Sequence, residues 1–196
     1  MLKKITVILH VMLGLMVFLP LTCHAFTILT KDEALKTIFG ESAKIVTETK
    51  ELSGPPLEKI TARLDGTMVF TQEGSESEEV EEQSSVDFLF ATKDGKKYGV
   101  AIIDVEPGKW GPVEFIVAMD LQGTVRTVKV MSYEEIRGRP IAETGFMNQY
   151  KGKSSKSALT VGKDIIGISG ATISSKAATF TVKKAIVMYE EFYLNK

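Results

Sequence analysis

Four short strand patterns, closely spaced along residues 86–131, constrain the fold of this chain more than any other feature. Each is rich in β-branched and aromatic residues. They cover Val86–Thr92, Lys97–Val105, Phe115–Asp120 and Val125–Met131. Asp94-Gly95 and Gln122-Gly123 separate the members of two pairs, and Gly-containing dipeptides at this spacing favour tight hairpins. Strands joined by hairpins are antiparallel, so we expect a mainly antiparallel sheet.

Two helical patterns flank these strands. The first, Thr30–Phe39, has Thr30 and Glu33 at capping-box spacing and stops at Gly40. The second, from about Ser175 to Tyr193, carries apolar residues at spacings of three and four. These residues are Ala178, Val182, Ala185, Tyr189 and Phe192. The sequence therefore predicts a single α+β domain, with a mainly antiparallel sheet flanked by helices and a long C-terminal helix.

The stretch before the strands contains mostly breaks and turns. Ser53-Gly54-Pro55-Pro56 interrupts the chain, and Asp65-Gly66 predicts a turn before a strand at Met68–Thr71. Glu73–Ser85 has six Glu and four Ser residues, which predict a solvated loop. We therefore divide the chain after its leader into an N-terminal helix and acidic-loop region, residues 26–85, and a main domain, residues 86–196.

The first 25 residues resemble a secretory signal. Lys3 and Lys4 are followed by the apolar run Ile5–Leu21, and Cys23-His24-Ala25 places small residues at a cleavage site. Cleavage would leave Phe26 as the first residue. The same run is close to the minimum length for a membrane-spanning helix, so an uncleaved anchor is the alternative. Both interpretations place the remaining chain in an extracytoplasmic, periplasmic space.

The distribution of histidine and cysteine excludes several kinds of chemistry. His10, Cys23 and His24 all lie in the leader, so residues 26–196 contain neither residue type. That part of the chain cannot form a Ser-His-Asp or Cys-His catalytic pair, a Cys/His zinc site or a His-ligated haem. It carries 22 basic and 25 acidic side chains, a net charge of −3 that gives no basis for nucleic-acid binding. We expect no catalytic residues and no metal ligands, so redox chemistry would need an organic cofactor.

A run of small residues, Gly167–Ser175, precedes the C-terminal helix. A helix N-terminus offers free N–H groups to an anion, and Gly170 and Ala171 would let a phosphate approach the backbone. The alternative is a simple helix cap, for which Ser174 or Ser175 would suffice. Trp110, in the turn Glu106–Pro112, is either a lid on the core or a ligand contact.

This run resembles a known motif. Ser169-Gly170-Ala171-Thr172 matches the end of Asp-x-x-Ser/Thr-Gly-Ala-Thr, the attachment motif of the FMN-binding domain family. That family includes the covalent flavin subunits of Rnf and Nqr membrane redox complexes and small exported flavoproteins. The resemblance extends over about residues 89–190, through Gly108–Phe115, Tyr133-Glu134-Glu135 with Arg137-Gly138, and Phe146–Lys153. One position departs from it, because Ile166 stands where the motif has Asp, and the nearest acid is Asp164.

The resemblance implies an FMN cofactor joined to Thr172 by a phosphodiester bond, which a separate FAD:protein FMN transferase forms from FAD with a divalent metal. Residues 86–196 would then be the FMN-binding domain. Ser169, Ser174 and the amides after Gly170 would lie at the phosphate, while Arg137 and Lys153 are either near it or solvated.

The aromatic residues of the resembling segments have two interpretations. Trp110, Tyr133 and Phe146 would stack on or enclose the flavin ring, and Glu134 would hydrogen-bond near it. For each aromatic residue, packing in the core is the alternative.

The leading functional hypothesis is an exported flavoprotein that passes electrons between a membrane redox complex or cytochrome and another acceptor. The alternative is a noncatalytic assembly or sensory module with noncovalent flavin or none, which Ile166 favours. A hydrolase or metalloprotein is disfavoured by the missing His and Cys.

Overall fold

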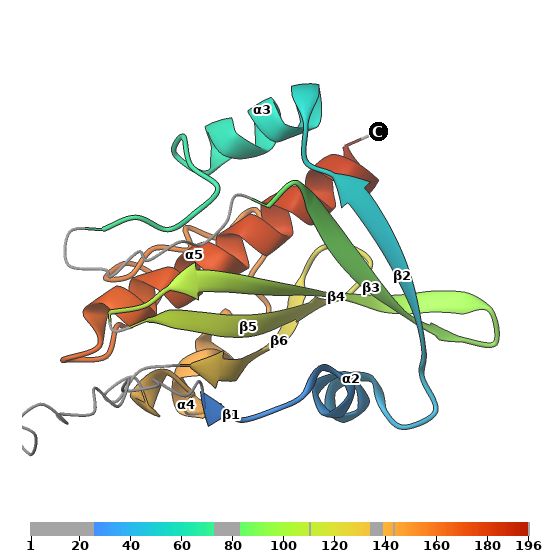
Figure 1. Ribbon diagram of the computed structural model, residues 1–196, viewed down its shortest axis with the longest axis horizontal. Coiled ribbons are helices and arrows are strands. Elements are labelled where there is room, and N and C mark those ends of the chain that lie inside the picture. Colours follow the sequence, from blue (N-terminus) through green and yellow to red (C-terminus); the bar gives the residue numbers. More distant parts are fainter. Residues whose placement is uncertain (1–25, 73–82, 110, 134–138, 143, 196) are drawn as a thin grey trace, which may run out of the picture.

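The computed structural model describes residues 26–72, 83–109, 111–133, 139–142 and 144–195 (Figure 1). The leader 1–25, most of the acidic loop, Trp110 and Glu134 therefore lie outside the described residues. Within the described ranges, no helix combines the length and apolar character needed to cross a bilayer.

A six-stranded antiparallel sheet forms the centre of the fold, in the order β1-β6-β5-β4-β3-β2. Its strands are β1 (Phe26–Thr27), β2 (Lys44–Glu51), β3 (Ser85–Lys93), β4 (Lys96–Pro107), β5 (Pro112–Met119) and β6 (Val125–Tyr133). Positive φ angles at Asp94, Gly95 and Gly123 form the two predicted hairpin turns. The four strands expected from the sequence are thus confirmed.

The turn that contains Trp110 closes a third hairpin. Pro107 pairs with Pro112, and the Gly108 N–H donates to the Gly111 carbonyl at 2.8 Å. Strands β3 to β6 are therefore one continuous antiparallel meander.

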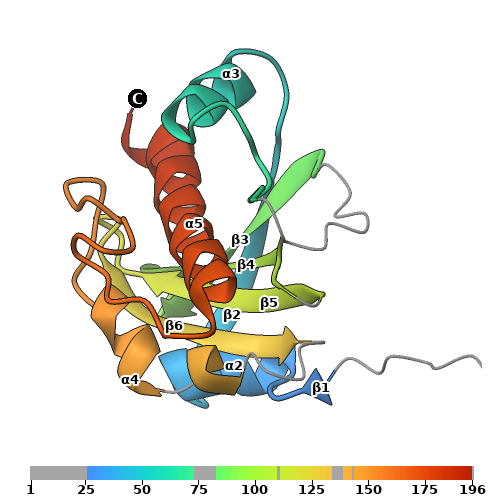
Figure 2. The same cartoon turned by 90° about the vertical axis from the view of Figure 1, so that its left-hand side faces the viewer.

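Helices cover both faces of the sheet (Figures 1 and 2). The long helix α5 (Thr172–Tyr189) and α3 (Gly54–Arg63) lie on one face, and α2 (Lys31–Phe39) lies on the other. The larger core packs Val182 and Ala185 of α5 against Phe90, Ile102 and Phe115. A smaller core packs Leu35 of α2 against Leu89 and Ile116. The predicted α+β architecture is confirmed.

The predicted bounds of the helices need one correction. Helix α2 has the expected capping box at Thr30 and Glu33. Helix α5, however, begins at Thr172 and not near Ser175, and it continues as a π-helical segment, Glu190–Leu194. Helix α5 is also buried on most of its surface, because the sheet, α3 and the loop that precedes α5 all pack against this helix.

The N-terminal region differs most from the prediction. Strand β2 and helix α3 were not expected, and Gly54-Pro55-Pro56 begins α3 because proline is well suited to the first turn of a helix. The strand expected at Met68–Thr71 was wrong. This segment is irregular, and the Phe70 N–H donates to the Glu106 carboxylate at 2.6 Å in place of a neighbouring strand.

Three short helices connect β6 to the loop before α5. They are a 3₁₀ helix at Arg139–Ala142, α4 (Thr144–Met147) and a 3₁₀ helix at Asn148–Tyr150.

Candidate functional site

The N-terminus of α5 presents an exposed hydroxyl at an open helix end. Thr172 is the first residue of the helix and is exposed, as are Ser169 and Gly170. The N-cap residue, Ala171, makes no side-chain hydrogen bond to the first turn of the helix. Gly170 has φ of +80°, and a Cβ added there would meet nothing within 4 Å. This end of α5 therefore has room for a phosphate.

Neither of the serines that could have capped α5 does so. Ser174 and Ser175 lie inside the first turn and are buried, so the alternative interpretation, in which one of them is the N-cap, was wrong. The Ser175 hydroxyl donates to the Ala171 carbonyl at 2.8 Å and accepts the Ile168 N–H at 3.1 Å. Through these two hydrogen bonds Ser175 links α5 to the motif loop, the segment before the helix that contains Ser169 and Gly170.

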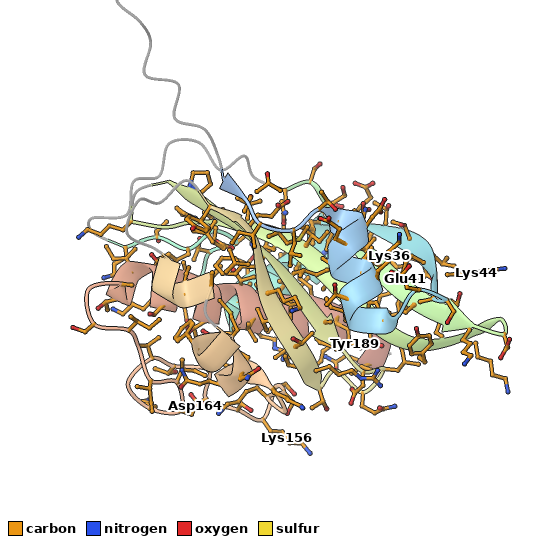
Figure 3. The ribbon with its side chains drawn as sticks, turned by 90° about the horizontal axis from the view of Figure 1, so that it is seen from below. Lys36, Glu41, Lys44, Lys156, Asp164 and Tyr189 are labelled. Atoms are coloured by element: carbon orange, nitrogen blue, oxygen red, sulfur yellow. The ribbon has the colours of Figure 1, made fainter. Side chains whose placement is uncertain are left out.

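The acid nearest to the motif, Asp164, is occupied by the loop that it organises. Its carboxylate accepts the N–H groups of Leu159 at 3.2 Å and Thr160 at 2.9 Å, and pairs with Lys153 at 2.9 Å. Partial burial acts to raise the pKa of Asp164, but these hydrogen bonds outweigh it and lower the pKa. In Figure 3, Asp164 lies on the loops at the lower edge of the molecule, away from Lys36 and Glu41 near α2. Lys153, which was predicted to lie near the phosphate or in solvent, thus forms an ion pair with Asp164.

Ile166, at the position of the motif acid, points into solvent with 79% of its surface exposed. Its backbone is fixed by Gln149, whose side-chain amide accepts the Ile166 N–H at 2.8 Å and donates to its carbonyl at 3.1 Å. The position is therefore ordered and accessible, although the side chain is apolar.

A pocket of about 300 Å³ lies beside α5, and Thr172 is not among the residues that line this pocket. Thr172, Lys176 and Phe180 are spaced four residues apart, which places them on one face. Its lining comprises Asp65, Phe70, Leu159, Thr160, Val161, Lys176, Thr179, Phe180 and Lys183. The Phe70 and Phe180 rings lie 6.1 Å apart at the pocket. An aromatic ring compound attached near Thr172 could enter this space.

Lys176 is a functional candidate that the sequence analysis missed. It lies one turn beyond Thr172 and is half-buried, and it forms no ion pair with any residue in the described ranges. The other pocket lysine, Lys183, pairs with Asp65 at 2.9 Å. A basic residue four positions after the motif threonine was the available clue in the sequence.

Two of the three aromatic residues predicted to contact the flavin, Tyr133 and Phe146, lie in the core. Tyr133 is buried at the end of β6, and Phe146 of α4 packs edge-on against Tyr150 with ring centres 5.7 Å apart. Ala171 belongs to the same core cluster as both rings. Their contact with a flavin stays a prediction, as do the roles of Trp110 and Glu134.

Comparisons with known proteins identify the segment that carries this site. Residues 108–187 match the family model of the FMN-binding domain. The chain is also 32% identical over 114 residues to a Clostridium ljungdahlii protein named as one subunit of a proton-translocating ferredoxin:NAD(+) oxidoreductase complex. The alignment covers 54% of this chain and 61% of that relative. Residues 108–187 therefore belong to the FMN-binding domain family, and the cofactor that the family indicates is FMN.

Proposed function

We propose that this chain is an exported electron-transfer flavoprotein that carries FMN on Thr172 through a phosphodiester bond. The observation that carries the proposal is the exposed Thr172 hydroxyl at the uncapped end of α5, inside the segment that matches the FMN-binding domain. FMN, when bound, accepts and donates one or two electrons. The residues of the chain bind and orient it.

In this proposal the N-terminus of α5 binds the phosphate, and the pocket binds the flavin ring. A phosphate ester on Thr172 would lie at the N-terminus of α5, and Lys176, one turn further along the helix, would supply a positive charge near it. Thr179, in the pocket wall, lies seven residues beyond Thr172, or about 10 Å along the helix axis. An extended ribityl chain spans this distance and would place the flavin ring in the pocket, against the aromatic wall formed by Phe70 and Phe180.

Attachment requires an external enzyme. A threonine hydroxyl is a weak nucleophile, and residues 26–196 have no His or Cys to activate it. The FAD:protein FMN transferase would supply the base and metal. In that reaction the Thr172 oxygen would form a bond to the phosphorus of the FMN half of FAD, AMP would leave, and the hydroxyl proton would pass to the base of the transferase.

The relative supports the electron partner that we propose, and the leader supports the location. The relative is named as part of a ferredoxin:NAD(+) oxidoreductase complex, which supports a membrane redox complex as the partner, with a cytochrome as the alternative. The leader supports export to the periplasm, or anchoring by the same segment if it is not cleaved.

A second candidate is a noncatalytic assembly or sensory module with noncovalent flavin or none. The observation that favours it is the exposed Ile166 at the position of the motif acid. If the transferase needs that acid, Thr172 would stay unmodified.

The first test is the intact mass of the protein coexpressed with the transferase. The wild type should gain the mass of FMN minus water, and the flavin should map to the peptide that contains Thr172. Thr172→Val should abolish the gain, because valine keeps the β-branched shape and lacks the hydroxyl. The matched control is Thr37→Val, which removes an exposed helical hydroxyl on the opposite face of the sheet. Flavin on Ser169 in the wild type would refute the assignment to Thr172.

The second test addresses the departure from the motif. Ile166→Asp should raise the loaded fraction, and the 79% exposure of the side chain means that folding should change little. Ile166→Asn is the control, since it removes the isoleucine without adding a charge. Equal loading of wild type and Ile166→Asp would show that the missing acid does not limit attachment, and absence of flavin from both would favour the second candidate.

A further inference from the structure

A buried cluster of three charged side chains lies between α5 and the sheet. Lys184 of α5 pairs with Asp104 at 2.8 Å and with Glu106, and both acids are on β4. All three residues are at most 2% exposed. The Lys184 ammonium group also donates to the Met68 carbonyl at 3.1 Å, and Glu106 accepts the Phe70 N–H. None of the three residues lies in a recognisable motif of the sequence.

The charges of this cluster do not balance when all three groups are ionised. Two carboxylates face one ammonium group, which leaves one negative charge in a low-dielectric region. Neither carboxylate oxygen of Asp104 has an aligned hydrogen bond to any described residue, although one oxygen is in ion-pair contact with Lys184. A buried negative charge that no further cation balances is costly, and binding a proton removes that cost.

The direction of the pKa shifts agrees with this geometry. Burial raises the pKa of Asp104, and burial together with the charge of Asp104 raises the pKa of Glu106 to about 8, even though Lys184 opposes both shifts. Burial lowers the pKa of Lys184, but the two carboxylates outweigh it and raise the pKa. The lysine therefore stays charged, and the proton belongs to the carboxyl pair.

Among the described residues, no other charged group near the cluster compensates for it. The side chains that β3 and β5 present on this face include Val86, Phe88, Val113 and Phe115, all buried and apolar. The other charged groups of the described surroundings fall into three sets. Asp65, Lys176 and Lys183 line the pocket. Lys59 pairs with Glu191 and Arg63 with Glu190, and Asp87 and Glu114 lie on the opposite face of the sheet.

The cluster lies directly behind the aromatic wall of the pocket beside Thr172. Phe70 lines the pocket with its side chain, and its N–H donates to Glu106. Phe180 lines the pocket too, and the Lys184 ammonium nitrogen is 5.7 Å from the centre of its ring. A charge placed in the pocket is therefore close to the cluster, with little water between them.

We propose that Asp104, Glu106 and Lys184 form a proton-binding site that takes one proton from water and senses the charge of the cofactor in the neighbouring pocket. The ionised cluster carries one negative charge, and a proton bound to a carboxylate oxygen makes it neutral. An electron added to the cofactor favours the neutral form. The proton-binding half stands on the cluster alone, whereas the coupling rests on the proposed function.

The proton-binding half is tested on full-length protein without flavin. Urea unfolding is followed from pH 5 to 9 in the wild type and in Asp104→Asn, which leaves one carboxylate for one ammonium group. Between pH 5 and 8 the folded wild type retains a proton that the unfolded chain has released, so stability falls as the pH rises. The unfolding equilibrium constant should rise by up to tenfold per pH unit more than in the variant. Equal slopes would overturn the proposal.

A measurement on the wild type protects this test against a variant that fails to fold. Infrared difference spectra between pH 6 and pH 9, with ¹³C-labelled Asp and Glu, should show a protonated carboxyl band that disappears at pH 9. Absence of this band would overturn the proposal.

The coupling is tested by the pH dependence of the flavin midpoint potential in loaded protein. Between pH 6 and 9 the potential of the wild type should fall more steeply with pH than that of Asp104→Asn. The matched control, Asp87→Asn, removes a carboxylate from the opposite face of the sheet and should behave as the wild type. Identical profiles for wild type and Asp104→Asn would overturn the coupling and leave the flavoprotein function intact. Failure to bind flavin would overturn the function and, with it, the coupling, while the flavin-free titration still decides proton binding.

Discussion

At the scale of single residues, Thr172 owes its accessibility to the backbone of its neighbours. Gly170 adopts φ of +80°, a conformation that costs other residues about 1–2 kcal/mol. Gly167 has a different task, because a Cβ there would lie 2.8 Å from a methyl carbon of Val161. Of the two glycines in the small-residue run, Gly170 opens the phosphate position, and Gly167 allows close packing behind it.

Lys176 provides the residue-scale prediction. Lys176→Met should weaken the binding of free FMN several-fold, since a half-exposed lysine contributes about 1 kcal/mol to a charge pair. The free energy of unfolding should change by less than about 0.5 kcal/mol, because Lys176 pairs with no described acid and methionine suits a helix equally well. A fluorescence titration with FMN in the Thr172→Val background measures the affinity. Lys31→Met, in α2, is the control, and an equal loss of affinity there would contradict a role for Lys176.

At the scale of elements, the start of α5 and the motif loop form one unit through Ser175. Ser175→Ala leaves the Ile168 N–H without its side-chain acceptor and should destabilise the fold by about 1–3 kcal/mol. The fraction loaded with FMN should fall as well, because the loop that presents Thr172 loses its attachment. Chemical denaturation and intact mass give the two readouts.

The control for that prediction is Thr181→Val. The buried Thr181 hydroxyl donates within α5, to the Ala177 carbonyl, and does not reach the motif loop. It should lower stability without changing the loaded fraction. A fall in loading equal to that of Ser175→Ala would mean that loading depends on the stability of α5 in general.

Elements with a strong local pattern were predictable, and those that depend on tertiary contacts were not. Strands β3 to β6 alternate or are continuously apolar, and α2 has its capping box, so both are encoded locally. Strand β2 is an edge strand with the mixed sequence Lys44–Glu51, mostly exposed on both faces, so it has no apolar pattern. Met68–Thr71 has strand-like residues, but Glu106 takes the N–H that a ladder would use.

The site was predictable where a motif marks it and hidden where burial decides. Thr172 and Gly170 were found by their motif. Asp104 and Glu106 look like ordinary solvent-facing positions in a strand, because the sequence does not show that Lys184 covers them. The same ambiguity made Ser174 and Ser175 resemble caps, although both are buried within the helix.

At the scale of the whole molecule, the two regions divided at residue 85 share one sheet and one core. Strand β2 pairs with β3 along its whole length, and Leu52, Ile60 and Leu64 belong to the same cluster as the side chains of α5. Each of these three leucine and isoleucine side chains is worth about 1.5–3 kcal/mol when buried. Their sum is comparable to the entire stability of a typical domain, about 5–15 kcal/mol. We therefore expect residues 26–85 to fold together with the rest.

Leu64→Ala tests this expectation. Leu64 is fully buried at the end of α3, so its truncation should lower the free energy of unfolding by about 2–5 kcal/mol. If the chain is one cooperative unit, far-UV circular dichroism and the fluorescence of the single Trp, which belongs to the segment after residue 85, should shift by the same amount. Val46→Ala, at a half-exposed position of β2, should shift both by much less. A fluorescence transition that stays in place while the dichroism moves would show that residues 86–196 fold independently, because the probe beyond residue 85 would then not sense the loss of packing in α3.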